Sequence, residues 1–287
     1  MFKKIVMQTI ILATDFSEAA LCAARYTAAL TKQIPVSRIV LYHSYYAMLS
    51  TDTPLIDAEY YSVLQKESIS RLNELKRKLA PLTAKGVCIE CLAGIFPLRD
   101  AIRTGLLKEN PGLIVMGITG KDQTKEKIMG SQAVMAARHT SVPLLLIPFD
   151  TKFKEIKKVV FAWDMKYSAK IFPEKLFKDI LHILKAELLV FNVDHKNKSF
   201  GAEIIDEQKF MHRVLEKENV SFFYSDHPDA VEGIIGFAER QLADAVIVIP
   251  RRDAFPENLF RKKVTKRLAY RIKIPLLILP GDSPEKH

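Results

Sequence analysis

The sequence predicts an α/β protein made of two tandem doubly wound domains, each a five-stranded, mostly parallel sheet with helices on both faces. Two observations predict this class. Short apolar runs alternate with segments of helical composition, which is the pattern of parallel strands joined by helical crossovers. The whole pattern then occurs a second time within 287 residues, a length that suits two domains of roughly 140 residues each.

The first half is expected to contain five strands separated by helices. Apolar runs that end at glycine, proline or polar residues indicate buried strands. Alanine- and leucine-rich segments between them favour helices, and either Asp15 or Ser17 is placed to cap the first of these. The expected strands span 10–13, 37–45, 87–92, 113–116 and 144–147, and the expected helices span 19–31, 58–80 and 98–108, with a further helical segment after Ser131. Leucines and Ile69 at near-helical spacing predict the buried face of the helix at 58–80.

An internal repeat predicts the domain organisation. Asp164 follows an apolar run just as Asp15 does, at an offset of 149 residues. Later segments correspond too: 188–193 mirror the second strand, 225–228 mirror 94–97, and 275–280 mirror 143–148. The repeat predicts one domain over residues 1–150 and a second over 151–287.

Bulk composition narrows the class of protein. The chain has 48% hydrophobic and 26% charged residues, and no apolar run reaches the roughly 20 residues that a membrane-spanning helix needs. The N-terminus lacks a signal-peptide pattern and the three cysteines fit a reducing compartment, so a cytoplasmic protein is expected. Basic residues exceed acidic ones by 18 to 13 in residues 1–150 and by 25 to 20 in 151–287. The net charge of +10 is therefore spread evenly, which favours anionic ligands without supplying a nucleic-acid-binding tail.

The stretch between the fourth and fifth expected strands carries the strongest functional pattern. It reads Gly117-x2-Gly120-x9-Gly130-Ser131. Glycines let a backbone approach a ligand closely, and a helix that begins near Ser131 would present N–H groups to a phosphate. The spacing is neither that of a Walker A motif nor that of the Rossmann fingerprint.

This spacing resembles the nucleotide loop of the universal stress protein family, G-x2-G-x9-G-S/T, and the resemblance extends over the whole chain as a tandem of two such domains. It implies a bound adenine nucleotide, ATP with or without Mg²⁺, near the aspartate, the end of the second strand and the glycine loop. Carried over by position, the implied binding residues are Ala13, Thr14, Asp15, Ser44 or a neighbour, Met116, Gly117, Gly120, Gly130, Ser131 and Gln132. Gln132 departs from the small apolar residue common in the family.

Each of these residues also has a purely structural interpretation. In this interpretation the role of Asp15 is to cap a helix and the role of the glycines is to form turns, without any contact to a ligand. His43 is more typical of a buried strand histidine than of a catalytic base, and Cys88 and Cys91 fit a strand better than a redox or metal site because nothing else completes such a site.

The second half lacks the glycine loop. It has PRRDAFPENLFRKKV where the first half has GITGKDQTKEKIMGS, with Pro250 and Asp253 near the positions of Gly117 and Gly120. Many cations follow between Arg251 and Lys273. They form either a solvated helix face or an anion site that replaced the nucleotide site.

The function expected from these observations is an adenine-nucleotide-binding stress-response protein that acts as a nucleotide-dependent signalling or protective module. No nucleophile–base pair, carboxylate dyad or metal cluster stands out, so catalysis beyond slow ATP hydrolysis is not expected. There are two alternatives: the protein is a scaffold that binds no nucleotide, or it is a slow ATPase. In both, the second half binds an anion or a lipid. The resemblance also implies that the last strands pair the two halves as an internal pseudo-dimer, with homodimerisation and an unidentified protein partner as further options.

Overall fold

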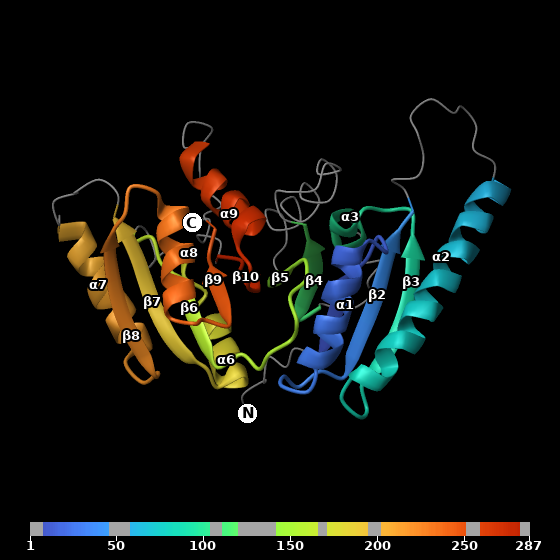
Figure 1. The fold of residues 1–287 in the computed structure, drawn as a ribbon, viewed down its shortest axis with the longest axis horizontal. Coiled ribbons are helices and arrows are strands. Elements are labelled where there is room, and N and C mark those ends of the chain that lie inside the picture. Colours follow the sequence, from blue (N-terminus) through green and yellow to red (C-terminus); the bar gives the residue numbers. More distant parts are fainter. Residues whose placement is uncertain are drawn as a thin grey trace, which may run out of the picture. The chain divides into compact units, whose positions relative to one another are not determined.

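The computed structural model describes residues 8–45, 58–103, 111–119, 142–165, 171–194, 202–250 and 259–281. They form two compact units, of which the first ends at Phe153 and the second begins at Lys154 (Figure 1). Each unit is a five-stranded parallel sheet with helical crossovers. The predicted fold class, two tandem doubly wound α/β domains, is confirmed.

The sheet of unit 1 has the strand order β3-β2-β1-β4-β5, and all its pairs are parallel. All five strands occur where the apolar runs predict them. Their bounds are β1 Thr9–Ala13, β2 Arg38–Ser44, β3 Cys88–Gly94, β4 Leu113–Ile118 and β5 Leu144–Pro148. The central strands are continuous buried apolar runs, as is typical of parallel strands that are covered on both faces.

The helices of unit 1 are α1 Glu18–Leu30, α2 Ala58–Leu79 and α3 Leu98–Arg103, with a short 3-10 turn, η2, at Ala80–Leu82. The chain moves from β1 to β3 in one direction across the sheet and from β3 to β5 in the other. A right-handed crossover therefore puts the connection that contains α3 on the face opposite α1 and α2. On α2, Ser68 is buried and Ile69 only half-buried, so the expected place of Ile69 in the buried stripe is wrong by one position.

Unit 2 repeats this topology with the order β10-β9-β6-β7-β8, again all parallel. Its strands are β6 Lys158–Ala162, β7 Glu187–Asp194, β8 Val220–Asp226, β9 Ala245–Val248 and β10 Leu276–Ile278. Its helices are α6 Glu174–Leu184, α7 Ala202–Leu215, α8 Ala230–Arg240 and α9 Leu259–Arg271. Strand β6 takes the place of β1, as the sequence repeat predicts.

Candidate functional site

The expected site of unit 1 lies at the carboxyl edge of its sheet, where the strand order reverses. Strand β1 is flanked by β2 and β4, and Ala13, its last residue, pairs with Tyr42. Both neighbours continue two residues further, to Ser44 and Ile118. Such a switch point is where ligands bind in open α/β sheets. The register thus brings residues 13–15, Ser44 and residues 116–117 to one edge.

Asp15 is exposed in the turn that follows β1. Its Oδ1 accepts the N–H of Ser17 at 3.0 Å, and Thr14 Oγ1 accepts the N–H of Phe16 at 3.0 Å. Ser17 is the N-cap of α1, because its side chain accepts the N–H of Ala20 at 3.2 Å. Of the two residues that the sequence offers as the cap of α1, Ser17 is therefore the cap. The carboxylate of Asp15 is not needed for capping.

His43, near the end of β2, is buried against the turn that carries Asp15. Its Nδ1 lies 2.8 Å from the carbonyl oxygen of Thr14, and because a carbonyl only accepts, Nδ1 carries the hydrogen. The ring of Phe16 lies 4.6 Å from the imidazole, centroid to centroid. Burial lowers the pKa of His43, and nearby Arg71 lowers it further, against the Thr14 bond and Asp15, which raise it. His43 is thus a buried strand histidine, as expected.

Gly117 has a packing role that the sequence does not reveal. A Cβ at this position would lie 2.2 Å from the carbonyl oxygen of Ala19 and 2.8 Å from the nitrogen of Ala20, so α1 touches β4 backbone to backbone. Close helix–strand contact therefore requires glycine here. The side chain of Met116 is buried, which leaves only its backbone for a ligand. The remaining candidates, Gly120, Gly130, Ser131 and Gln132, lie outside the described residues.

Tyr42 is a supporting residue that sequence reasoning missed. Its hydroxyl donates to the carbonyl oxygen of Phe96 at 2.5 Å, and burial raises its pKa to about 12. A Cβ on Gly94 would lie 3.2 Å from this hydroxyl oxygen. The bond fixes the turn after β3 at the same edge. The available signal was a tyrosine inside an apolar strand, because its hydroxyl needs a partner when buried.

Comparison with known proteins assigns the first unit to a protein family. The profile of the universal stress protein family matches residues 7–148. Unit 1 is therefore a domain of the universal stress protein family. The crystal structure of a universal stress protein from Archaeoglobus fulgidus DSM 4304 is similar, with a TM-score of 0.73, 18% identity and coverage of 97% of this chain and 99% of that one. A putative universal stress protein from Pseudomonas aeruginosa UCBPP-PA14 has a TM-score of 0.60, 15% identity and coverage of 98% and 96%.

At these identities the likeness to solved structures shows the fold alone. It spans both units, so both have the fold seen in these structures. A search of curated protein sequences found no match.

The second unit keeps the backbone of the turn that carries Asp15 in unit 1, here called the aspartate turn. The N–H of Trp163 bonds Phe191 O as that of Thr14 bonds Tyr42 O, both at 2.9 Å. Left-handed residues follow each aspartate, Phe16 with φ 64° and Met165 with φ 50°. Asp164 is exposed like Asp15.

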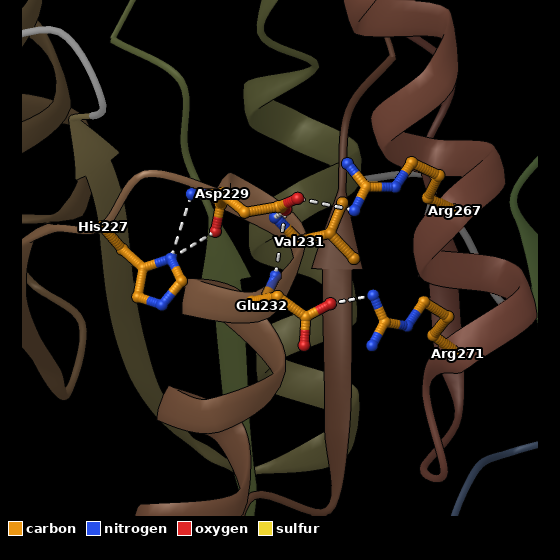
Figure 2. Close-up of polar contacts among 6 residues, drawn as sticks. All are labelled: His227, Asp229, Val231, Glu232, Arg267 and Arg271. Carbon is orange, nitrogen blue, oxygen red and sulfur yellow. Dashed lines mark hydrogen bonds and ion pairs between the residues drawn. The ribbon is translucent and has the colours of Figure 1, made fainter.

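Part of the basic run of unit 2 is paired internally (Figure 2). Asp229 caps α8 by accepting the N–H groups of Val231 and Glu232, and its other oxygen accepts from Arg267 of α9 at 2.6 Å. The hydrogen bond from Arg267 is the main cause that lowers the pKa of Asp229. Arg271 forms an ion pair with Glu232 one turn further along. These two cations join α9 to α8, and they are already neutralised within the unit.

Other kinds of site find no support in the described part of the chain. It contains no group of three His, Cys, Asp or Glu side chains that could hold a metal ion, and no helix there is long and apolar enough to cross a membrane. Cys88 and Cys91 are free thiols on the edge strand β3.

Proposed function

We propose that unit 1 binds an adenine nucleotide, ATP with Mg²⁺, and that the protein is a cytoplasmic, nucleotide-dependent signalling or protective module of the stress response. The observation that carries the proposal is the exposed carboxylate of Asp15 at the strand-order switch point of a universal stress protein domain. A structural cap would not need this residue, because Ser17 supplies the cap. Switch points are where nucleotides bind in doubly wound sheets.

Each candidate residue has a role that its chemistry allows. The Asp15 carboxylate accepts hydrogen bonds from the ribose hydroxyls, with Ala13 and Thr14 forming the floor beside it. The backbone at Ser44 faces the adenine, and the backbone at Met116 and Gly117 faces the ribose. Gly120, Gly130, Ser131 and Gln132 surround the phosphates. Glycine N–H groups and a helix start favour phosphate oxygens there.

ATP acts in this proposal as a bound signal rather than as a substrate. Mg²⁺ is held through phosphate oxygens and water, as this ion prefers, and it needs few protein ligands. Binding shifts the conformation of the glycine loop only as far as ATP prefers one conformation over another. That shift then changes the affinity for a protein partner.

The test is the nucleotide content of the purified chain, compared between two matched variants. Asp15→Ala and Asp164→Ala remove an exposed carboxylate from the same backbone position in each unit. Chromatography of the denatured wild type should release adenine nucleotide close to equimolar with the chain, Asp164→Ala should retain it, and Asp15→Ala should lose it. Gly117 is unsuitable for such a test, because any side chain there displaces α1.

The outcomes separate the proposal from its rivals. A wild-type protein that is empty and whose melting temperature ignores added ATP would refute nucleotide binding and favour the scaffold. Equal losses in both variants would refute the assignment of the site to unit 1. Phosphate release that disappears in Gly130→Val would favour the slow ATPase. The pseudo-dimer and the homodimer stay predictions, which sedimentation of the full chain with and without ATP tests.

A further inference from the structure

We propose that His43 is a positioning residue for Asp15, and that its protonation weakens nucleotide binding by unit 1 as the pH falls. The nucleotide in this inference rests on the proposed function, whereas the role of His43 rests on side-chain geometry. His43 is 3% exposed and lies beneath the turn. It acts through Asp15 rather than by touching the ligand.

His43 supports the residues on both sides of Asp15. Its Nδ1–H donates to the carbonyl oxygen of Thr14 at 2.8 Å, and its ring lies against that of Phe16 with an interplanar angle of 49°. Phe16 has the left-handed backbone conformation, which is unfavourable for a residue other than glycine. A turn with such a residue needs support from outside, and His43 provides it. The direction of the carboxylate of Asp15 therefore depends on the imidazole.

A proton has no suitable place on this imidazole. With the hydrogen on Nδ1, Nε2 is an acceptor, and it is buried with no hydrogen-bond partner among the described residues. Protonation would create a buried N–H and a positive charge with no acceptor in the described part of the chain, a costly combination. From α2, the guanidinium of Arg71 lies 4.0 Å over the ring of Phe16, and its charge disfavours a positive charge on His43.

The groups that face His43 divide into two sets. Arg71 disfavours the charged form, as burial does, while Asp15 and the Thr14 carbonyl favour it. Burial is the largest of these effects, so the pKa lies below its ordinary 6.5. A protonated His43 is better solvated when the turn over it opens. Opening displaces Asp15, and the form that binds nucleotide is then depopulated.

Unit 2 supplies a natural variant of this arrangement. Asn192 stands at the position of His43, and its Nδ2 donates to the carbonyl oxygen of Trp163 at 2.8 Å. The turn keeps its left-handed residue, Met165. An amide thus makes the same hydrogen bond as the imidazole but does not titrate between pH 5 and 8. Both turns therefore have a side-chain hydrogen-bond donor. The donor of unit 1, a histidine, can be protonated, whereas the amide of unit 2 cannot.

The experiment measures ATP affinity of the full chain by calorimetry between about pH 5 and 8, for wild type, His43→Asn and His43→Leu. Below the pKa of His43 the wild-type affinity should fall by up to about tenfold per pH unit relative to His43→Asn. The phosphate titration of ATP is common to both proteins and cancels in this ratio. His43→Leu, which lacks the donor, should bind more weakly than His43→Asn at pH 8.

The possible results separate the role of His43 from nucleotide binding itself. Parallel affinity profiles of wild type and His43→Asn down to pH 5 would overturn the inference. If the asparagine variant does not fold, the NMR titration of His43 in the wild type replaces it: ATP should lower its pKa, and an unchanged pKa overturns the inference. Absence of ATP binding at pH 8 would refute the proposed function instead. The role of His43 is then tested by unfolding, because wild type should lose stability relative to His43→Asn as the pH falls below 6.5.

Discussion

Gly117→Ala should destabilise unit 1 strongly, although alanine is the smallest side chain that can be added. The new Cβ would meet the carbonyl oxygen of Ala19 at 2.2 Å, and an ordinary contact begins near 3.4 Å, so α1 or β4 must move by about 1.2 Å. The obstacle is backbone, which cannot rotate away. Overpacking of this kind costs about 3 kcal/mol, the upper end of its usual range. The lower entropy of the unfolded alanine chain offsets up to about 1 kcal/mol, which leaves about 2 kcal/mol of lost stability.

Urea denaturation followed by far-UV circular dichroism measures this loss. A loss of about 2 kcal/mol with a slope of about 2 kcal/mol/M lowers the transition midpoint of unit 1 by about 1 M. The chain has one tryptophan, the buried Trp163 of unit 2, so fluorescence follows the other unit in the same samples.

Gly236→Ala is the matched control for this substitution. Gly236 lies inside α8, and its added Cβ meets only the flexible end of Arg240, at 3.2 Å. The same change should therefore stabilise unit 2 by about 0.5–1 kcal/mol, because glycine is unfavourable within helices. A Gly117→Ala protein whose midpoint stays within about 0.2 M of wild type would refute the reasoning about the contact between α1 and β4.

Two further substitutions test contacts at the carboxyl edges. Tyr42→Phe removes the hydroxyl that bonds Phe96 O and should lower the stability of unit 1 by about 1 kcal/mol in urea; no loss would mean that this carbonyl finds another donor. Asp229→Asn keeps a good cap but loses the ion pair with Arg267, and since both side chains are at least one-third exposed, it should cost at most about 1 kcal/mol. The folded pKa of Asp229 is lowered, so its contribution is present above the ordinary 3.8 and disappears as the pH falls through the folded value. Thermal melts of wild type and Asp229→Asn should converge in acid, and a constant difference would contradict the ion pair as the cause.

The sequence is sufficient to predict the fold of both units. Apolar runs identify the strands, because buried parallel strands need apolar residues on both faces, and the recurrence of these runs in the same order identifies the second unit. Local patterns were less informative about which residue of a helix is buried, as Ser68 in place of Ile69 shows. The edge of the sheet that would carry the site also follows from the strand pattern, which places Asp15 at a strand end.

What the sequence does not show is contact between distant positions. Gly117 fits a ligand loop by spacing, but its requirement for glycine comes from α1, about a hundred residues earlier in the chain. His43 and Thr14 are 29 residues apart, and Asp229 and Arg267 are 38 apart. Such pairs depend on register and helix packing, which residue spacing along the chain does not encode.

The aspartate turn has a consequence for how related sequences are classified. Unit 2 retains the exposed aspartate, the left-handed residue after it and the side-chain donor beneath it, although its glycine motif is gone. The turn therefore occurs with this architecture whether or not the glycine motif accompanies it. The aspartate and the glycine motif together distinguish unit 1 from unit 2, so a survey for nucleotide-binding members should require both.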